Sequence, residues 1–207
     1  MNRNPDFKGV LLAAAVAIFA GCGIPTIKDY SPQAVPAPAG APALRVAVAL
    51  TDNQSPTPSE SEMNEKLADI RAQHKSAFVT PEVNVVANYS TNKGSPIGPE
   101  ALTEILIKEL QATEAFTSVE NEGAGPADAV VKPVLKTCVY TIFGNTHYVF
   151  DLEMQVSVTK KGRKVMDKGY ARRWQNLGMN IFKQLYQELL PEVMKEIRND
   201  IVASLKR

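Results

Sequence analysis

The chain has 207 residues, with 23 lysines and arginines, 22 aspartates and glutamates and a formal net charge of +1 at pH 7. Balanced charge gives no long-range attraction to nucleic-acid phosphates, so we expect no nucleic-acid partner. The length allows one domain with a sizeable core and little more.

The amino terminus has the pattern of an export signal. Arg3 and Lys8 provide a positive start, and Val10–Ala20 (VLLAAAVAIFA) is uncharged and apolar. This run is shorter than the roughly twenty apolar residues of a spanning helix, and small residues close it, as signal peptidases require. We therefore predict a signal peptide over residues 1–21.

Residues 20–22 (AGC), at the junction between the predicted signal peptide and Cys22, resemble the lipobox of bacterial lipoproteins. The resemblance implies that Cys22 is diacylated, becomes the first residue after cleavage and is acylated on its amino group. Phe19 departs from the motif, which usually has an aliphatic residue there. Gly23 replaces the aspartate that marks inner-membrane retention, so the resemblance implies the periplasmic face of the outer membrane. The alternative is an ordinary export signal in which the cysteine stands by chance.

Three acyl chains would attach the protein stably to a bilayer, because each buried methylene contributes roughly 0.8 kcal/mol. Residues 22–43 are then the predicted tether, in which prolines alternate with small residues (AVPAPAGAPA). Such a segment favours extended geometry of about 3.1 Å per residue. We expect it to be semi-rigid, not packed on the domain. With Cys22 acylated, Cys138 has no disulfide partner, and its apolar neighbours predict a buried core residue.

A single domain is predicted over residues 44–207. In its first stretch, 44–50 (LRVAVAL), Leu44, Val46, Val48 and Leu50 alternate with smaller or charged residues, which predicts a strand with one core face. The next elements are a break at 51–59, an amphipathic helix at 60–74, an edge strand or extended arm at 78–89 and a turn-rich loop at 91–98.

A second helix is predicted to open at Pro99 and to end near Ala112, because proline is favoured in a first helical turn. Its buried stripe would comprise Leu102, Ile105, Leu106 and Leu110. A short strand or extended exit at 115–120 and a loop at 120–128 follow. Three β segments come next, at 129–143, 147–159 and 164–174, with a hairpin turn at 160–163.

From Met179 the chain is predicted to be helical to its end, and Pro191 should kink or restart that helix. The predicted buried stripe is Phe182, Leu185, Leu189, Val193 and Ile197. Together the elements predict an α+β domain: a mixed, mostly antiparallel sheet with helices packed on one face and a long C-terminal helix. Because the strands cluster in the second half, we do not expect a parallel α/β sheet.

Residues 45–50 (RVAVAL), 101–120 (ALTEILIKELQATEAFTSVE) and 127–137 (ADAVVKPVLKT) resemble motifs of a group of envelope lipoproteins. The group includes the penicillin-binding-protein activators, the curli secretion lipoprotein and the amino-terminal domain of TolB. In this chain residues 51–98 replace the short link between first strand and helix. The lipopolysaccharide-assembly lipoproteins, with two helices on a sheet, are a comparable match by architecture.

The sequence has no motif that carries chemistry: G-x-S-x-G, H-E-x-x-H, P-loop and C-x-x-C patterns are all absent. His147 shares a strand face with Asp151 and Glu153, but His147 and Asp151 would lie about 13 Å apart along the strand, too far to share one ion. We therefore expect no enzyme, metal or cofactor. A hydrolase with scattered carboxylates would require a cleft with perturbed carboxylates.

Basic residues gather in the predicted carboxy-terminal hairpin. They have two interpretations: charges that keep an edge strand solvated, or a contact for lipid phosphates, lipopolysaccharide or an acidic protein surface. In the second case Tyr170 and Trp174 would be aromatic anchors, although Trp174 equally suits the core. The candidate residues are Lys160, Lys161, Arg163, Lys164, Lys168, Arg172 and Arg173.

Two functions agree with these observations. The first is a lipid-anchored, non-enzymatic periplasmic module that recruits or regulates an envelope assembly or secretion machine by binding an envelope protein. The second is an outer-membrane transport accessory subunit that binds lipopolysaccharide or phospholipid between sheet and helices. The first needs an exposed protein-binding patch, and the second needs an apolar cavity with a basic rim. The oligomeric state is not predicted.

Overall fold

The computed structural model describes residues 30–37, 39, 43–55, 83–88, 98–143, 147–177 and 184–206. The predicted signal peptide, Cys22 and the helix expected at 60–74 lie outside these residues. The predicted limits of the tether and the domain therefore remain predictions.

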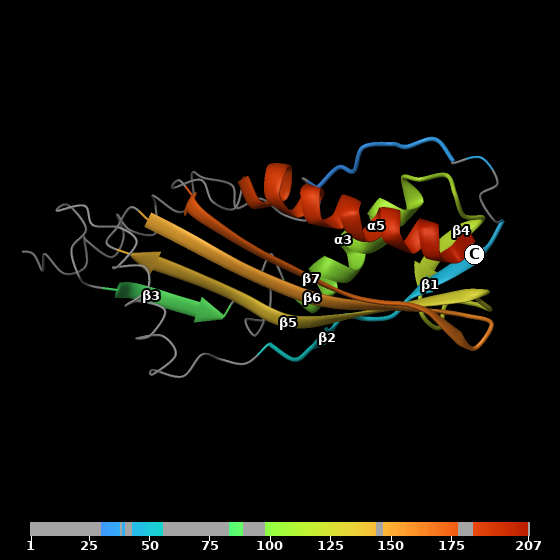
Figure 1. Ribbon diagram of the computed structural model, residues 1–207, viewed down its shortest axis with the longest axis horizontal. Coiled ribbons are helices and arrows are strands. Elements are labelled where there is room, and N and C mark those ends of the chain that lie inside the picture. The colour runs from blue at the N-terminus through green and yellow to red at the C-terminus, as the bar shows by residue number, and fades with distance from the viewer. Residues whose placement is uncertain are drawn as a thin grey trace, which may run out of the picture.

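The described strands form one mixed sheet, as the sequence predicts (Figure 1). The strand order is β4-β1-β5-β6-β7, and β2 and β3 also pair with β5. Pairing is antiparallel for β3–β5, β5–β6 and β6–β7, and parallel where β1 meets β4 and β5 and where β2 meets β5. The strands are β1 (Arg45–Val48), β2 (Asp52–Asn53), β3 (Val83–Asn88), β4 (Ser118–Asn121), β5 (Ala129–Phe143), β6 (His147–Lys160) and β7 (Arg163–Leu177).

Strand β5 is central, although it contains Pro133 and proline within a strand favours an edge or a bulge. Val131 is in register with the last residue of β1, and Val134 with the first residue of β2. Pro133, which has no N–H to donate, therefore lies opposite the break between these two short strands. An irregularity in the pairing with β6 falls just beyond it, between Leu135 and Thr137.

Alternation along β6 decides which sheet face carries the core. One face of the strand is buried and the other is partly exposed, as the sequence pattern predicts. The residues on the buried face are Phe150, Leu152, Met154, Val156 and Val158.

Two helical segments cover that buried face (Figure 1). Helix α3 (Pro99–Gln111) contacts β1 and β4, whereas α5 (Leu190–Lys206) contacts β6 and β7. The predicted α3 stripe is fully buried. A π-helical segment, η3 (Leu185–Leu189), directly precedes α5, and the Leu190 N–H donates to the Leu185 carbonyl. This wider turn lies next to Pro191, where the sequence predicts a helical irregularity.

The first strand is shorter than predicted, and the prediction for Leu50 was wrong. Strand β1 ends at Val48, and Leu50 is 63% exposed. Ala47 and Ala49, expected to face away from the core, are buried. Ala47 is in register with Glu120 of β4 and Val130 of β5, so larger side chains flank this small residue on both sides.

The segment 30–37, which we name the strap, corrects the expectation of an unpacked tether. It lies along the outer side of the helix pair, away from the sheet (Figure 1, blue). Tyr30 is buried, and the Val35 N–H donates to the Ala112 carbonyl at 2.9 Å. An extended, proline-containing segment can lie across two helices because it needs few hydrogen-bond partners of its own.

A buried ion pair joins the strap to both helices. Arg198 Nη1 on α5 donates to Glu109 Oε2 on α3 at 2.9 Å, and both side chains are 2% exposed. The Tyr30 hydroxyl donates to Glu109 Oε1 at 2.6 Å. Burial raises the pKa of the Tyr30 phenol far above its usual range, and the hydrogen bond to Glu109 adds to the rise, so the phenol remains a donor.

We predict that Arg198→Met lowers the free energy of unfolding by roughly 3–5 kcal/mol, because it leaves the Glu109 carboxylate buried without its cation. Urea denaturation followed by Trp174 fluorescence measures the change. The double variant Glu109→Leu/Arg198→Met should recover much of the loss, since no lone buried charge remains. A single variant as stable as the wild type would contradict this role of the pair.

Candidate functional site

The basic hairpin predicted from the sequence consists of β6, β7 and the two-residue turn between them. Lys161 and Gly162 both have positive φ, 48° and 77°, which is the geometry of a tight hairpin turn. In the described sheet β7 is an edge strand. The structure therefore places the cluster where solvating charge is useful, as the first interpretation requires.

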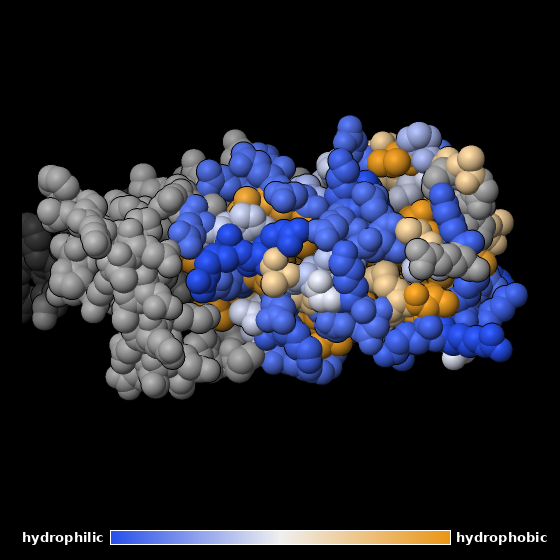
Figure 2. Space-filling view, viewed as in Figure 1, coloured by the Kyte–Doolittle hydropathy of each residue, from blue (hydrophilic) through white to orange (hydrophobic). Residues whose placement is uncertain are grey.

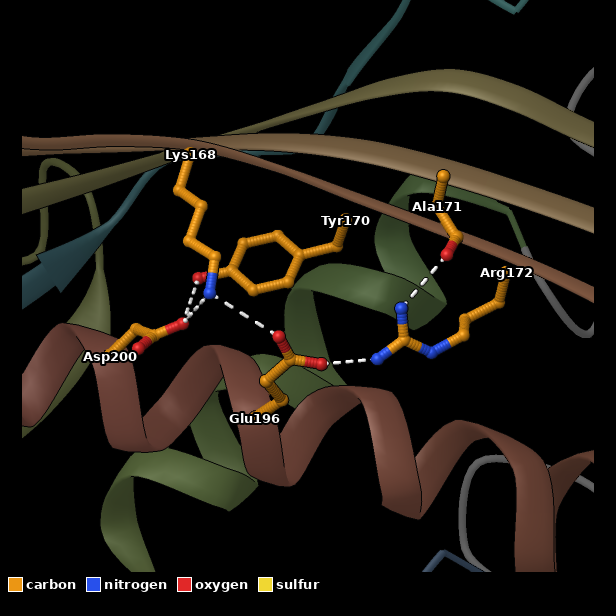
Figure 3. Close-up of polar contacts among 6 residues, drawn as sticks. All are labelled: Lys168, Tyr170, Ala171, Arg172, Glu196 and Asp200. Atoms are coloured by element: carbon orange, nitrogen blue, oxygen red, sulfur yellow. Dashed lines mark hydrogen bonds and ion pairs between the residues drawn. The ribbon is translucent and has the colours of Figure 1, made fainter.

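Two of the predicted cations face α5. Lys168 Nζ contacts Asp200 Oδ2 at 2.7 Å and Glu196 Oε1 at 3.3 Å (Figure 3). Arg172 forms an ion pair with the same Glu196 and also donates to the Ala171 carbonyl. Since these carboxylates come from α5, the two cations attach the last helix to the sheet edge.

The two aromatic residues proposed as anchors pack inside the domain. Tyr170 is buried, and its hydroxyl donates to Asp200 Oδ2 at 2.9 Å (Figure 3). Burial raises the pKa of the Tyr170 phenol well above its usual range, and the hydrogen bond to Asp200 contributes further. Half-buried Trp174 stacks on Phe150 with ring centroids 5.5 Å apart.

Three more predicted cations have partners within the fold. Lys160 Nζ donates to the Leu205 carbonyl at 2.7 Å, which satisfies a carbonyl at the end of α5. Lys164 Nζ contacts Asp167 at 2.7 Å. Arg173 Nε and Nη2 on β7 donate to Asp151 Oδ1 and Oδ2 on β6, at 2.6 and 3.2 Å.

Lys161 and Arg163, at the turn, are exposed, and no ion pair joins either to another residue in the described part of the chain. The seven cations thus separate into three groups: Lys160, Lys168 and Arg172 have partners on α5, Lys164 and Arg173 have partners on the strands, and Lys161 and Arg163 lie at the turn. Binding of a partner by this cluster remains a prediction.

The sheet face opposite the helices carries a feature that the sequence reading missed. An open depression of about 430 Å³ lies between β5, β6 and β7. Gly169 and Ala171, the small residues on this face of β7, are the signal that could have indicated it, because they alternate with large side chains on the helix side. The lining residues are Thr137, Asp151, Leu152, Glu153, Ala171, Arg172 and Arg173.

Charge in this depression is nearly compensated. The Arg173–Asp151 pair occupies one wall, and the Arg172 side chain is bonded to α5. Glu153 is exposed, and its carboxylate accepts a long hydrogen bond of 3.5 Å from the Thr137 hydroxyl. Among the residues that line the depression, Glu153 is therefore the carboxylate that no described ion pair neutralises, which favours a cationic group on whatever binds there.

Cys138 is buried, as predicted, and its desolvation raises the thiol pKa to about 12. Among the described residues, no three histidine, cysteine or carboxylate side chains are placed to share a metal ion. None of the helices in the described residues has the length and apolar character needed to cross a bilayer. In the view of Figure 2, hydrophilic residues cover most of the described surface, with hydrophobic ones scattered among them.

Comparison with known proteins supports the fold. No protein-family description and no curated protein matches the sequence. A solved structure from Xanthomonas campestris, XCC0632, with the family description DUF330, is 11% identical with a TM-score of 0.53, covering 84% of this chain and 94% of that one. At this identity the likeness shows a shared fold.

Two other solved structures are more distant. The lipoprotein GNA1162 from Neisseria meningitidis is 13% identical with a TM-score of 0.32, covering 76% of this chain and 99% of its own. The PelC dodecamer from Paraburkholderia phytofirmans is 13% identical with a TM-score of 0.34, covering 84% and 93%. The resemblance to the TolB group remains a prediction.

We predict that Asp200→Asn flattens the acid dependence of stability. The hydrogen bond from Lys168 holds the Asp200 pKa below its usual range. A carboxylate with a lowered folded-state pKa stabilises the fold above its unfolded pKa, near 4, and loses that contribution as the pH falls through the lower folded value. The wild type should therefore lose stability more steeply below about pH 4 than the variant does.

Urea midpoints at pH 7, 4 and 3 measure this difference. The matched control is Glu120→Gln, which removes an exposed carboxylate from β4 at the opposite sheet edge. Equal acid slopes for the wild type and Asp200→Asn would show that the contact with Lys168 does not stabilise the packing of α5.

Proposed function

We propose that this protein is a lipid-anchored, non-enzymatic binding module on the periplasmic face of the outer membrane. In this role it recruits or regulates an envelope assembly or secretion machine by binding one of its proteins. The lipobox-like sequence at Cys22 supports the anchor, and the fold shared with XCC0632 supports the domain architecture.

The observation that carries the binding role is the open depression between β5, β6 and β7. The residues that line it belong to long paired strands, whose backbone is already ordered before a partner binds. This order lowers the entropic cost of binding. The carboxylate of Glu153 favours a protein segment that presents a lysine or arginine. Such a segment would approach the carboxylate across the small residues of β7.

The alternative, a carrier of lipopolysaccharide or phospholipid, would use space between the sheet and the helices. In the described structure one close-packed cluster occupies that region. Phe150 and Leu152 from β6 and Ile105 and Ile197 from the helices are at most 2% exposed. An acyl chain would have to separate these close-packed side chains and replace their contacts with its own. This packing favours the protein partner.

The anchor is tested by expressing the full chain in a bacterium and comparing the wild type with Cys22→Ser. The membrane-extracted wild type should have the mass of residues 22–207 plus three acyl chains, and the variant should lose its membrane association. A soluble wild-type protein with an unmodified Cys22 thiol would contradict both the lipoprotein hypothesis and the proposed outer-membrane location.

The binding surface is tested with a photo-crosslinking amino acid placed at Thr137, which lines the depression and leaves Glu153 in place. The matched control carries the same group at Ala203, an exposed position on α5. We expect the first position to capture a protein of an envelope assembly or secretion machine, and Ala171→Arg to abolish capture by filling the depression. Equal capture from both positions, or capture of lipid alone, would count against the proposal.

A further inference from the structure

The strap connects the predicted membrane anchor to one particular side of the domain. Three contacts attach it to the helix pair: the Tyr30 hydroxyl donates to Glu109, Arg198 donates to the Gln33 carbonyl at 3.4 Å, and the Val35 N–H donates to the Ala112 carbonyl. The strap crosses the helices on the side away from the sheet (Figure 1). The depression lies on the opposite side of the domain.

The chain between the anchor and the strap is short. Only eight Cα steps separate Cys22 from Tyr30. A fully extended chain spans at most about 3.3–3.6 Å per residue, so Tyr30 stays within about 28 Å of the lipidated residue. The buried hydroxyl of Tyr30 prevents the rest of the predicted tether from adding to this reach.

This length is smaller than the path around the domain. A helix with its side chains is about 10–12 Å across, and packed helices lie 8–10 Å apart. To lay the open sheet face on the bilayer, the chain would pass about 10 Å sideways around the helix pair. It would then descend about 20 Å or more through the helix and sheet layers. About 28 Å of chain cannot complete that path.

We propose that the strap orients the domain so that its helix layer faces the bilayer and its open sheet face, with the depression, is held off it. The inference rests on the anchor of the proposed function. The bilayer is then the neighbour of the helix layer, whose exposed residues on α5, such as Glu192, Lys195 and Asn199, are polar and suit headgroups. The depression is left to a partner that approaches from the aqueous side.

The orientation can be measured with tryptophan as a donor, since the chain has one tryptophan, Trp174. In a Trp174→Phe background, which keeps an aromatic ring on Phe150, we would place the donor on α5 with Lys195→Trp or in the depression with Glu153→Trp. Vesicles of phosphatidylethanolamine and phosphatidylglycerol would carry a dansyl-labelled phosphatidylethanolamine as the acceptor. Urea midpoints would establish that both variants fold.

We expect at least about twofold more energy transfer from position 195 than from position 153, because about 20 Å of structure separates the two faces. An insert of about 20 glycines and serines after Pro25 should abolish the difference, because the longer tether lets the domain turn over. Equal transfer from both positions, greater transfer from 153, or a difference that survives the insert would overturn the proposal.

The test is kept separate from the question of natural acylation. Protein that is acylated on Cys22 is reconstituted directly. If mass spectrometry finds Cys22 unmodified, the same thiol is coupled to a maleimide lipid, which places an anchor at the same residue. Failure of acylation thus counts against the proposed function alone, whereas loss of the difference between positions 195 and 153 counts against the orientation.

Discussion

The buried contact of Arg198, Glu109 and Tyr30 is the interaction on which the arrangement of this domain depends. It joins α5, α3 and the strap, three segments far apart in the sequence, at one point inside the helix layer. Taking both charges out of water is costly. A buried ion pair offsets this cost only if its geometry is good and the remaining donors and acceptors of both groups form hydrogen bonds. The Tyr30 hydroxyl contributes one such hydrogen bond, which makes the strap part of the folded domain.

A second set of charges holds the other side of α5. Glu196 and Asp200 face Lys168 and Arg172 on the edge strand, while Tyr170 supplies a hydrogen bond below them. Exposed pairs of this kind contribute little singly, so their role is to fix the position of the helix over the sheet edge. The same charges keep the edge strand hydrated. A basic stretch in a sequence can thus serve internal packing as much as recognition.

The two faces of the sheet have separate roles in the proposed protein. The helix side contains the core and receives the strap, whereas the other side displays paired charges and small residues on rigid strands. In the proposed role, an anchor connected through the strap to the helix side would leave the polar side available to a partner. The fold is shared with XCC0632 at 11% identity, so the two chains have in common the arrangement of their helices and strands.

Local pattern in the sequence was sufficient for the main elements. Periodicity and turn chemistry, which act over a few residues, were enough to predict five features. These are the buried stripe of α3, the alternation of β6, the hairpin turn at Gly162, the burial of Cys138 and the α+β class. Tertiary structure alone decided the rest. Leu50 is exposed because β1 ends at Val48. Pro133 is tolerated because two short strands leave a break opposite it. Lys168 faces carboxylates that lie about thirty residues later in the chain. The strap depends on contacts between distant segments, which no local pattern encodes. The small residues of β7 border a depression only because β5 and β6 lie beside them in the sheet.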